Sequence, residues 1–172
     1  CPVIVPALID AAAALVVEGW PQTTLDFAAT RLPPPWRRTY PIGLDVEVCT
    51  FAALERAWRE ADQPYHREHV LPYLYEGVTL DAAPVARGVS RRGFRIAQLN
   101  HHPDCGALRW TVDTAEDLEL LRQVYARFGG RDDFSWQEVL ALFEREPELG
   151  QINAHVKHKT FQDEDPRSQR VK

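Results

Sequence analysis

The run Arg109-Trp-Thr-Val-Asp113-Thr114 places a carboxylate at the end of an apolar, β-prone segment and directly before a predicted helix. Ligands of open α/β sheets bind outside the carboxyl ends of strands, so Asp113 stands where a catalytic group or a metal ligand would stand. The N-terminus of the next helix would keep the carboxylate ionised, which suits Mg²⁺. Asp113 could instead only assist the helix cap, and the two interpretations carry equal weight.

A second group of metal-binding residue types lies in the run His101-His102-Pro-Asp-Cys105, with His155 and His158 as further candidate zinc ligands. Neighbouring histidines rarely both bind one ion, and no second paired motif at standard spacing accompanies them. An ordinary turn is therefore the favoured interpretation. No Ser or Cys lies in a nucleophile-elbow context, which argues against a hydrolase, and Cys49 is expected to be a small packed hydrophobe.

The overall charge excludes some classes of partner. A formal net charge of −5 and a pI near 5.7 favour neither nucleic acid nor an anionic membrane, because both attract basic patches. Arginine clusters such as Arg37-Arg38 and Arg91-Arg92 suit a small anionic ligand or a solvated surface. Three cysteines without CxxC spacing indicate a reducing compartment, and no stretch reads as a signal peptide or a membrane span, so the cytoplasm is expected.

The first half of the chain alternates predicted helices and strands. The spacing predicts a helix over Pro6 to Val17, a short strand over Leu25 to Ala29 and a strand over Leu44 to Cys49. Thr50 should cap a helix that runs to about Ala61. A further helix begins at Pro64, and Pro72 should kink it.

The second half continues the alternation. Residues 77–92 read as an irregular loop, and strands follow over Phe94 to Leu99 and Leu108 to Val112. Capping boxes at Thr114–Asp117 and Ser135–Glu138 each begin a helix. A frayed tail is expected beyond about Lys159. Strands interleaved with helices, without internal repeats, indicate one α/β domain.

Several of these segments together resemble the cytidylyltransferase family, and specifically its spore-coat polysaccharide biosynthesis branch, which is related to the acylneuraminate and Kdo cytidylyltransferases. The blocks occur in the family's order and cover nearly the whole chain. They are Arg38-Thr-Tyr-Pro-Ile-Gly-Leu-Asp-Val-Glu-Val48, Leu54-Glu-Arg-Ala-Trp58, Arg67-Glu-His-Val-Leu-Pro-Tyr73, Leu108-Arg-Trp-Thr-Val-Asp-Thr-Ala-Glu-Asp-Leu118 and Ile152-Asn-Ala-His-Val156.

The resemblance implies an α/β fold of the nucleotide-diphospho-sugar transferase type, a Rossmann-like mixed sheet. It implies transfer of CMP from CTP to a sugar acid, with release of pyrophosphate and with Mg²⁺ as the metal, in surface or spore-coat polysaccharide synthesis. Relatives are commonly dimers, and the strand from Leu44 to Cys49 could contribute to a homodimer interface.

The resemblance also assigns site residues. Asp113 matches the family's metal-ligating and catalytic aspartate, with Ala115 in place of the family's proline. His69 and Tyr73, at i and i+4 of the predicted helix, fall where relatives place a His and a Tyr facing the sugar. The expected substrate-binding residues are Arg38, Tyr40, Asp45, Glu47, His69 and Tyr73.

The sequence departs from the family at its front. It contains no methionine and begins with Cys1, and it lacks the family's nucleotide-binding loop and the aspartate that would precede Cys1. Residues 1–159 are thus expected to be the C-terminal, acceptor-side part of an N-terminally truncated domain, and residues 160–172 a flexible tail. The alternatives are a non-catalytic sugar-binding or dimerisation half domain, an incomplete gene product, or a glycosyltransferase of the same fold.

Overall fold

The protein is described by a computed structural model that covers residue 14, residues 25–33 and residues 36–157. The helix predicted over Pro6 to Val17, apart from Ala14, and the tail predicted beyond Lys159 lie outside this part of the chain. Within it, the strands form a mixed four-stranded sheet in the order β2-β1-β4-β3. The strands are β1 (Phe27–Ala29), β2 (Glu47–Cys49), β3 (Val85–Val89) and β4 (Arg95–Leu99).

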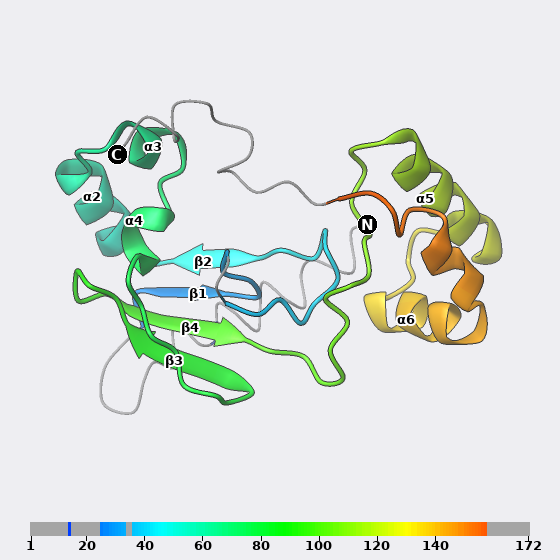
Figure 1. Ribbon diagram of the computed structural model, residues 1–172, viewed down its shortest axis with the longest axis horizontal. Helices are drawn as coiled ribbons and strands as arrows, with labels where there is room; N and C mark the ends of the chain where they lie inside the picture. Colours follow the sequence, from blue (N-terminus) through cyan, green and yellow to red (C-terminus); the bar gives the residue numbers. More distant parts are fainter. Residues whose placement is uncertain (1–13, 15–24, 34–35, 158–172) are drawn as a thin grey trace.

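The helices gather at the two ends of this sheet (Figure 1). One group lies at the end where β2 leads into the first helix, and the other lies at the end toward which β4 points. The first group is α2 (Phe51–Glu60), α3 (Pro64–Glu68) and α4 (Pro72–Tyr75), and the second is α5 (Ala115–Arg127), α6 (Trp136–Arg145) and the 3₁₀ helix η1 (Pro147–Gln151). Among the described residues, no helix is long and apolar enough to cross a membrane.

The sheet separates two apolar layers, because successive side chains of a strand point to opposite faces. In β1, Phe27 and Ala29 belong to the apolar cluster that includes residues of α2 and α4, whereas Ala28 belongs to the cluster that includes residues of α5, α6 and η1. In β4, Ile96 joins the first layer and Ala97 the second. The centre of the sheet is formed by the parallel pair β1 and β4, and five of their six apolar core residues are fully buried.

The predicted helix starts are confirmed at all three capping positions. The Oγ1 of Thr50 accepts from the Ala53 amide at the start of α2, at 3.2 Å. Capping boxes are complete at Thr114 before α5 and at Ser135 before α6. Each cap satisfies amide groups that the first helical turn leaves without a partner, which is why these short local patterns specify a helix start so well.

Three predictions of secondary structure are wrong. Residues 77–92 are not an irregular loop throughout, because β3 forms within them as the antiparallel neighbour of β4. The segment Leu108 to Val112 is not a strand, since it makes only a single parallel bridge, from Arg109 to Ile42. The predicted helix from Pro64 is two helices rather than one kinked helix, because α3 ends at Glu68 before α4 begins at Pro72.

Candidate functional site

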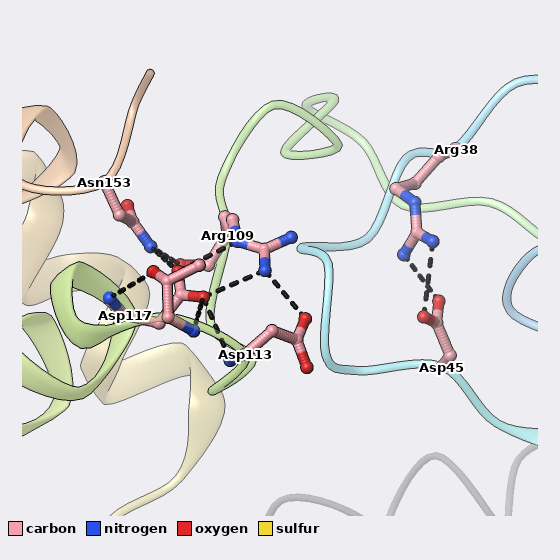
Figure 2. Close-up of polar contacts among 7 residues, drawn as sticks. Arg38, Asp45, Arg109, Asp113, Asp117 and Asn153 are labelled. Atoms are coloured by element: carbon pink, nitrogen blue, oxygen red, sulfur yellow. Dashed lines mark hydrogen bonds and ion pairs between the residues drawn. The ribbon is translucent and has the colours of Figure 1, made fainter. Parts of the chain in front are cut away.

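A buried ion pair between Arg109 and Asp117 lies at the N-terminus of α5 (Figure 2). The Arg109 side chain is 5% exposed and that of Asp117 is fully buried. The Nε of Arg109 donates to one carboxylate oxygen of Asp117 at 2.8 Å, and its Nη2 donates to the other at 2.9 Å. Two parallel hydrogen bonds fix the guanidinium plane relative to the carboxylate plane. The pair therefore holds the segment that carries Arg109 against the start of α5.

Further donors surround the Asp117 carboxylate. The Asn153 side-chain amide donates to it at 2.8 Å and also to the Arg109 carbonyl at 3.0 Å. The backbone amides of Asp113 and Thr114 donate to it at 3.0 and 3.1 Å. The hydrogen bonds from Arg109 first, and then those from Asn153 and Asp113, outweigh the effect of burial and hold the pKa of Asp117 far below its usual range.

Asp113 differs from Asp117 because it reaches solvent. Its side chain is 63% exposed, and one carboxylate oxygen accepts from Arg109 Nη2 at 2.7 Å. The residue sits two positions before α5, so the positive end of the helix dipole adds to the positive charge of Arg109 around this carboxylate. The structure therefore presents Asp113 as an exposed carboxylate that the Arg109 guanidinium orients.

The Asp113 carboxylate is a suitable ligand for a hard divalent cation, but it supplies only one side chain. A single exposed carboxylate can supply one ligand to Mg²⁺, which usually keeps several waters and substrate phosphate oxygens. Within the described residues, however, no three His, Cys, Asp or Glu side chains converge on one point. Asp113 could thus contribute to a shared metal site, whereas this part of the chain does not form a closed one.

The loop that carries Arg38 and Asp45 lies against the segment that carries Arg109. The Ile42 amide donates to the Leu108 carbonyl at 2.8 Å, and the Trp110 amide donates to the Ile42 carbonyl at 2.7 Å. Gly43 follows with φ of +105°, and a Cβ at this position would lie 2.8 Å from the Trp110 and Thr111 backbones. Only glycine allows so close an approach, so Gly43 is required to bring the two segments together.

Arg38 and Asp45 form a two-bond ion pair across this loop, with Nη1 and Nη2 of Arg38 at 2.5 and 3.2 Å from the carboxylate oxygens (Figure 2). Tyr40, between them, is buried among His101 and Trp136, and burial raises the pKa of its phenol. Glu47 is exposed on the edge strand β2. Of the predicted substrate-binding residues, Arg38, Tyr40 and Asp45 thus share the loop beside Arg109.

An open cavity of about 640 Å³ adjoins the same loop. It lies between the residues that flank Arg38 and the segments that precede β3 and follow β4. Its lining combines an aromatic ring, a guanidinium, an amide and imidazoles, which are the groups that bind polar sugars. They include Trp36, Arg37, Asn100, His101 and His102.

His69 and Tyr73 lie at the other end of the sheet, with α2 to α4 (Figure 1). Because the predicted helix is interrupted, these two residues do not share one helix face: His69 is the C-cap of α3 and Tyr73 belongs to α4. Tyr73 is 4% exposed, and its hydroxyl donates to Glu60 at 2.7 Å. The structure therefore does not bring these residues together with Asp113.

The zinc hypothesis finds no converging ligands in the described part of the chain. The Sγ of Cys105 lies 3.8 Å from His101 Nδ1, and burial raises the pKa of the Cys105 thiol. His155 lies 3.9 Å from Glu116, and His158 is outside the described residues. The chain bends at His102 and Pro103, which are joined by a cis peptide.

Sequence reasoning missed the central role of Asp117 and Asn153. Asp117 was expected only as the acidic partner in a capping box, and Asn153 only as part of a matching block. The four-residue spacing of Arg109, Asp113 and Asp117 could have indicated that one arginine contacts two carboxylates. Neither spacing nor composition indicates that Asn153, 36 residues after Asp117, donates to the same carboxylate.

No protein-family model matches the sequence. The chain is 29% identical over 124 residues to an uncharacterized protein of Methanocaldococcus jannaschii, a match that covers 71% of this chain and 45% of that protein. A cytidylyltransferase structure from Leptospira borgpetersenii superposes with a TM-score of 0.66 at 22% identity, covering 93% of this chain and 57% of that one. The chain therefore spans about half the length of the proteins that it matches, and it shares the mixed α/β fold of the Leptospira cytidylyltransferase.

Proposed function

We propose that this chain forms the acceptor side of a nucleotidyltransferase that moves CMP from CTP to a sugar acid in surface or spore-coat polysaccharide synthesis. The observation that carries the proposal is the exposed carboxylate of Asp113, which the buried Arg109–Asp117 pair holds at the N-terminus of α5. The fold shared with the Leptospira cytidylyltransferase supports the same class of reaction. A shared fold does not by itself fix the reaction, which depends on the residues of the site.

In this reaction a sugar hydroxyl oxygen forms a bond to the α-phosphorus of CTP, and the bond from that phosphorus to the β-phosphate oxygen breaks. The hydroxyl proton passes to solvent or to a nearby base, and pyrophosphate leaves. The protein accelerates such a step mostly by positioning the reactants and by stabilising the charge of the transition state.

Different residues of this chain would position the metal ion and the acceptor. Asp113 would supply one carboxylate oxygen to Mg²⁺, which when bound neutralises charge on the phosphates and on the leaving group. Arg109 would fix the direction of that carboxylate through the hydrogen bond from its Nη2. The acceptor would occupy the cavity beside the loop of Arg38, Tyr40 and Asp45, where a guanidinium can meet the carboxylate of a sugar acid.

The test measures pyrophosphate release from CTP, with N-acylneuraminate and Kdo as acceptors and Mg²⁺ present. It is run on the 172 residues and on the full translated reading frame that contains them. The Asp113→Asn variant should reduce the rate at least 100-fold, while Glu119→Gln, an exposed change on α5, should leave it unchanged. An unaltered rate for Asp113→Asn would remove Asp113 from the reaction.

A non-catalytic, sugar-binding half domain is the second candidate. It is favoured by the ion pair between Asp113 and Arg109, because a carboxylate that already has a cationic partner is less available to a metal ion. Calorimetry with millimolar CTP distinguishes the two. Saturable, Mg²⁺-dependent binding by the 172 residues excludes the non-catalytic candidate, whereas acceptor binding without CTP binding supports it.

A further inference from the structure

His101, which lines the open cavity beside the loop of residues 38–45, has a ring whose position is fixed by its neighbours. It lies two residues after β4, on the segment that leads toward α5 and α6 (Figure 1). Its backbone amide donates to Oγ1 of the buried Thr39 at 2.9 Å. Its ring centroid lies 5.4 Å from that of Tyr40 and 4.9 Å from that of Trp136. The imidazole can therefore offer only a narrow range of directions to a molecule in the cavity.

One ring nitrogen of His101 is bonded within the protein. Nδ1 lies 2.7 Å from the carbonyl oxygen of Pro103. A carbonyl oxygen can only accept, so Nδ1 carries the proton of this hydrogen bond. The Cys105 thiol does not compete for Nδ1, because its Sγ lies 3.8 Å from that nitrogen and donates to the Pro103 carbonyl at 3.4 Å. In the neutral ring, Nε2 is then a hydrogen-bond acceptor with a free lone pair.

The amide side chains of the same cavity are already bonded within the protein. The Gln98 side-chain amide donates to the Arg37 carbonyl at 2.6 Å and to Asn100 Oδ1 at 3.3 Å. The Asn100 amide donates in turn to the Ala83 carbonyl at 3.1 Å. By contrast, no described residue forms a hydrogen bond with Nε2 of His101, and this nitrogen is not among the buried side-chain atoms that lack a partner. The cavity therefore presents Nε2, rather than these amide groups, to a bound molecule.

We propose that His101 recognises a hydroxyl group of the acceptor sugar, and that its Nε2 accepts the hydrogen bond from that hydroxyl. The inference rests on the proposed function, since it takes the sugar to occupy this cavity. It holds alike for the transferase and for the sugar-binding half domain. An unprotonated Nε2 attracts a neutral donor and repels the carboxylate of a sugar acid. The hydroxyl groups of the sugar should thus face His101, and its carboxylate should face the exposed guanidinium of Arg37.

The loop that holds His101 also contacts the segment before Asp113. Thr39 accepts from the His101 amide through its side chain and from the Cys105 amide through its carbonyl, at 2.9 Å each. Three residues later, Ile42 exchanges backbone hydrogen bonds with the Arg109 segment. A sugar that is bonded to His101 would therefore lie against the loop that joins the cavity to the Asp113 segment. His101 would select the acceptor and fix its orientation, whereas Asp113 would act on the metal ion.

Long-range ¹H–¹⁵N spectra of the imidazole rings test the protonation of His101 in the 172-residue chain. In mildly alkaline buffer, where imidazoles are neutral, we expect the proton of His101 on Nδ1 and an unprotonated Nε2. The signals are assigned by their loss in the His101→Asn variant. A spectrum in which Nε2 carries the proton overturns the proposal, whichever sugar the chain binds.

Calorimetry with N-acetylneuraminate and with Kdo tests the recognition of the hydroxyl. His101→Asn keeps an N–H group near the position of Nδ1 and removes Nε2, so it should raise the acceptor Kd about 10-fold, the effect of one hydrogen bond. His101→Gln keeps an oxygen near the position of Nε2 and should stay within about threefold of the wild type. The control His155→Asn, an exposed change outside the lining of the cavity, should leave the Kd unchanged. Circular dichroism melts establish that each variant is folded.

The outcomes separate this proposal from the proposed function. Equal binding by the wild type and by His101→Asn overturns the role of His101 and leaves the acceptor assignment of the cavity intact. An equal loss of binding in His101→Asn and His101→Gln shows that packing of the ring matters rather than Nε2, and also overturns that role. A wild type that binds neither sugar acid at millimolar concentration overturns the acceptor assignment itself, together with the role of His101.

Discussion

Two aspartates four residues apart have opposite roles at the start of α5. Asp117 is fully buried and receives bonds from three segments, whereas Asp113 is mostly exposed and shares only the guanidinium. Removing one member of a buried pair leaves an uncompensated charge, which is far more costly than loss of an exposed pair. The two residues should therefore separate stability from activity.

Asp117→Asn should lower the free energy of unfolding by about 3 kcal/mol, because Arg109 would remain buried beside a neutral amide. The control Asp113→Asn should change it by less than about 1 kcal/mol. Urea unfolding followed by circular dichroism measures both. Equal effects of the two substitutions would contradict the division of roles.

The acid dependence of stability follows from the same group. The folded-state pKa of Asp117 is depressed, so its stabilising contribution is complete above the unfolded-state value near 4 and is lost as the pH falls further. Unfolding free energies measured from pH 6 to pH 2.5 should decline steeply below about pH 4 in the wild type. Asp117→Asn should show a shallower decline, and identical slopes would assign the acid sensitivity to other carboxylates.

At the scale of elements, the contact between the loop of residues 38–45 and the Arg109 segment depends on Gly43. Gly43→Ala adds a Cβ 2.8 Å from the neighbouring backbone at a positive φ, and should cost about 3 kcal/mol. Gly93→Ala is the matched control, because Gly93 has φ of +84° with no atom within 4 Å of the added Cβ, and should cost about 1 kcal/mol. Thermal unfolding measures both, and equal costs would show that backbone conformation alone matters at Gly43.

The elements that could be predicted from the sequence are those specified by contacts between residues that are close together in the chain. Thr50, Thr114 and Ser135 specify helix starts through bonds to amides three residues away. β3 could not be predicted, because it contains Gly88, whose missing side chain admits the Thr79 carbonyl, and glycine is rare inside strands. The segment of Leu108 to Val112 has the composition of a strand, but only Ile42 is placed to pair with it.

At the candidate site too, only features with local causes are visible in the sequence. The place of Asp113 directly before a helix cap could be predicted because the cap is a local pattern, and its catalytic role stays a prediction. The place of Asn153 could not be predicted, since it meets Asp117 only after η1 has turned the chain back. The spacing of His69 and Tyr73 predicts that they share a helix face. They do not, because α3 ends at Glu68 and α4 begins only at Pro72.

At the scale of the whole molecule, the two apolar layers share one sheet, so they should unfold together. Leu74 is fully buried in the layer of α2 and α4, and Leu142 is 2% exposed in the layer of α5 and α6. Leu74→Ala and Leu142→Ala should each cost about 3 kcal/mol. Each should also shift a single unfolding transition, seen alike by tryptophan fluorescence and circular dichroism. Two transitions, each moved by only one of the substitutions, would show that the layers are separate units.

The order of the elements along the chain has a consequence during synthesis. All four strands of the described sheet are complete by Leu99, whereas α5, α6 and η1, which supply many residues of the apolar cluster that contains Ala28 and Leu99, follow afterwards. At about 5–20 residues per second, the ribosome needs roughly 3–10 s to make these helices. During that interval the cluster around Ala28 and Leu99 is incomplete, so the nascent chain is most vulnerable to aggregation at this stage, and a chaperone that binds extended apolar surfaces should act on it then.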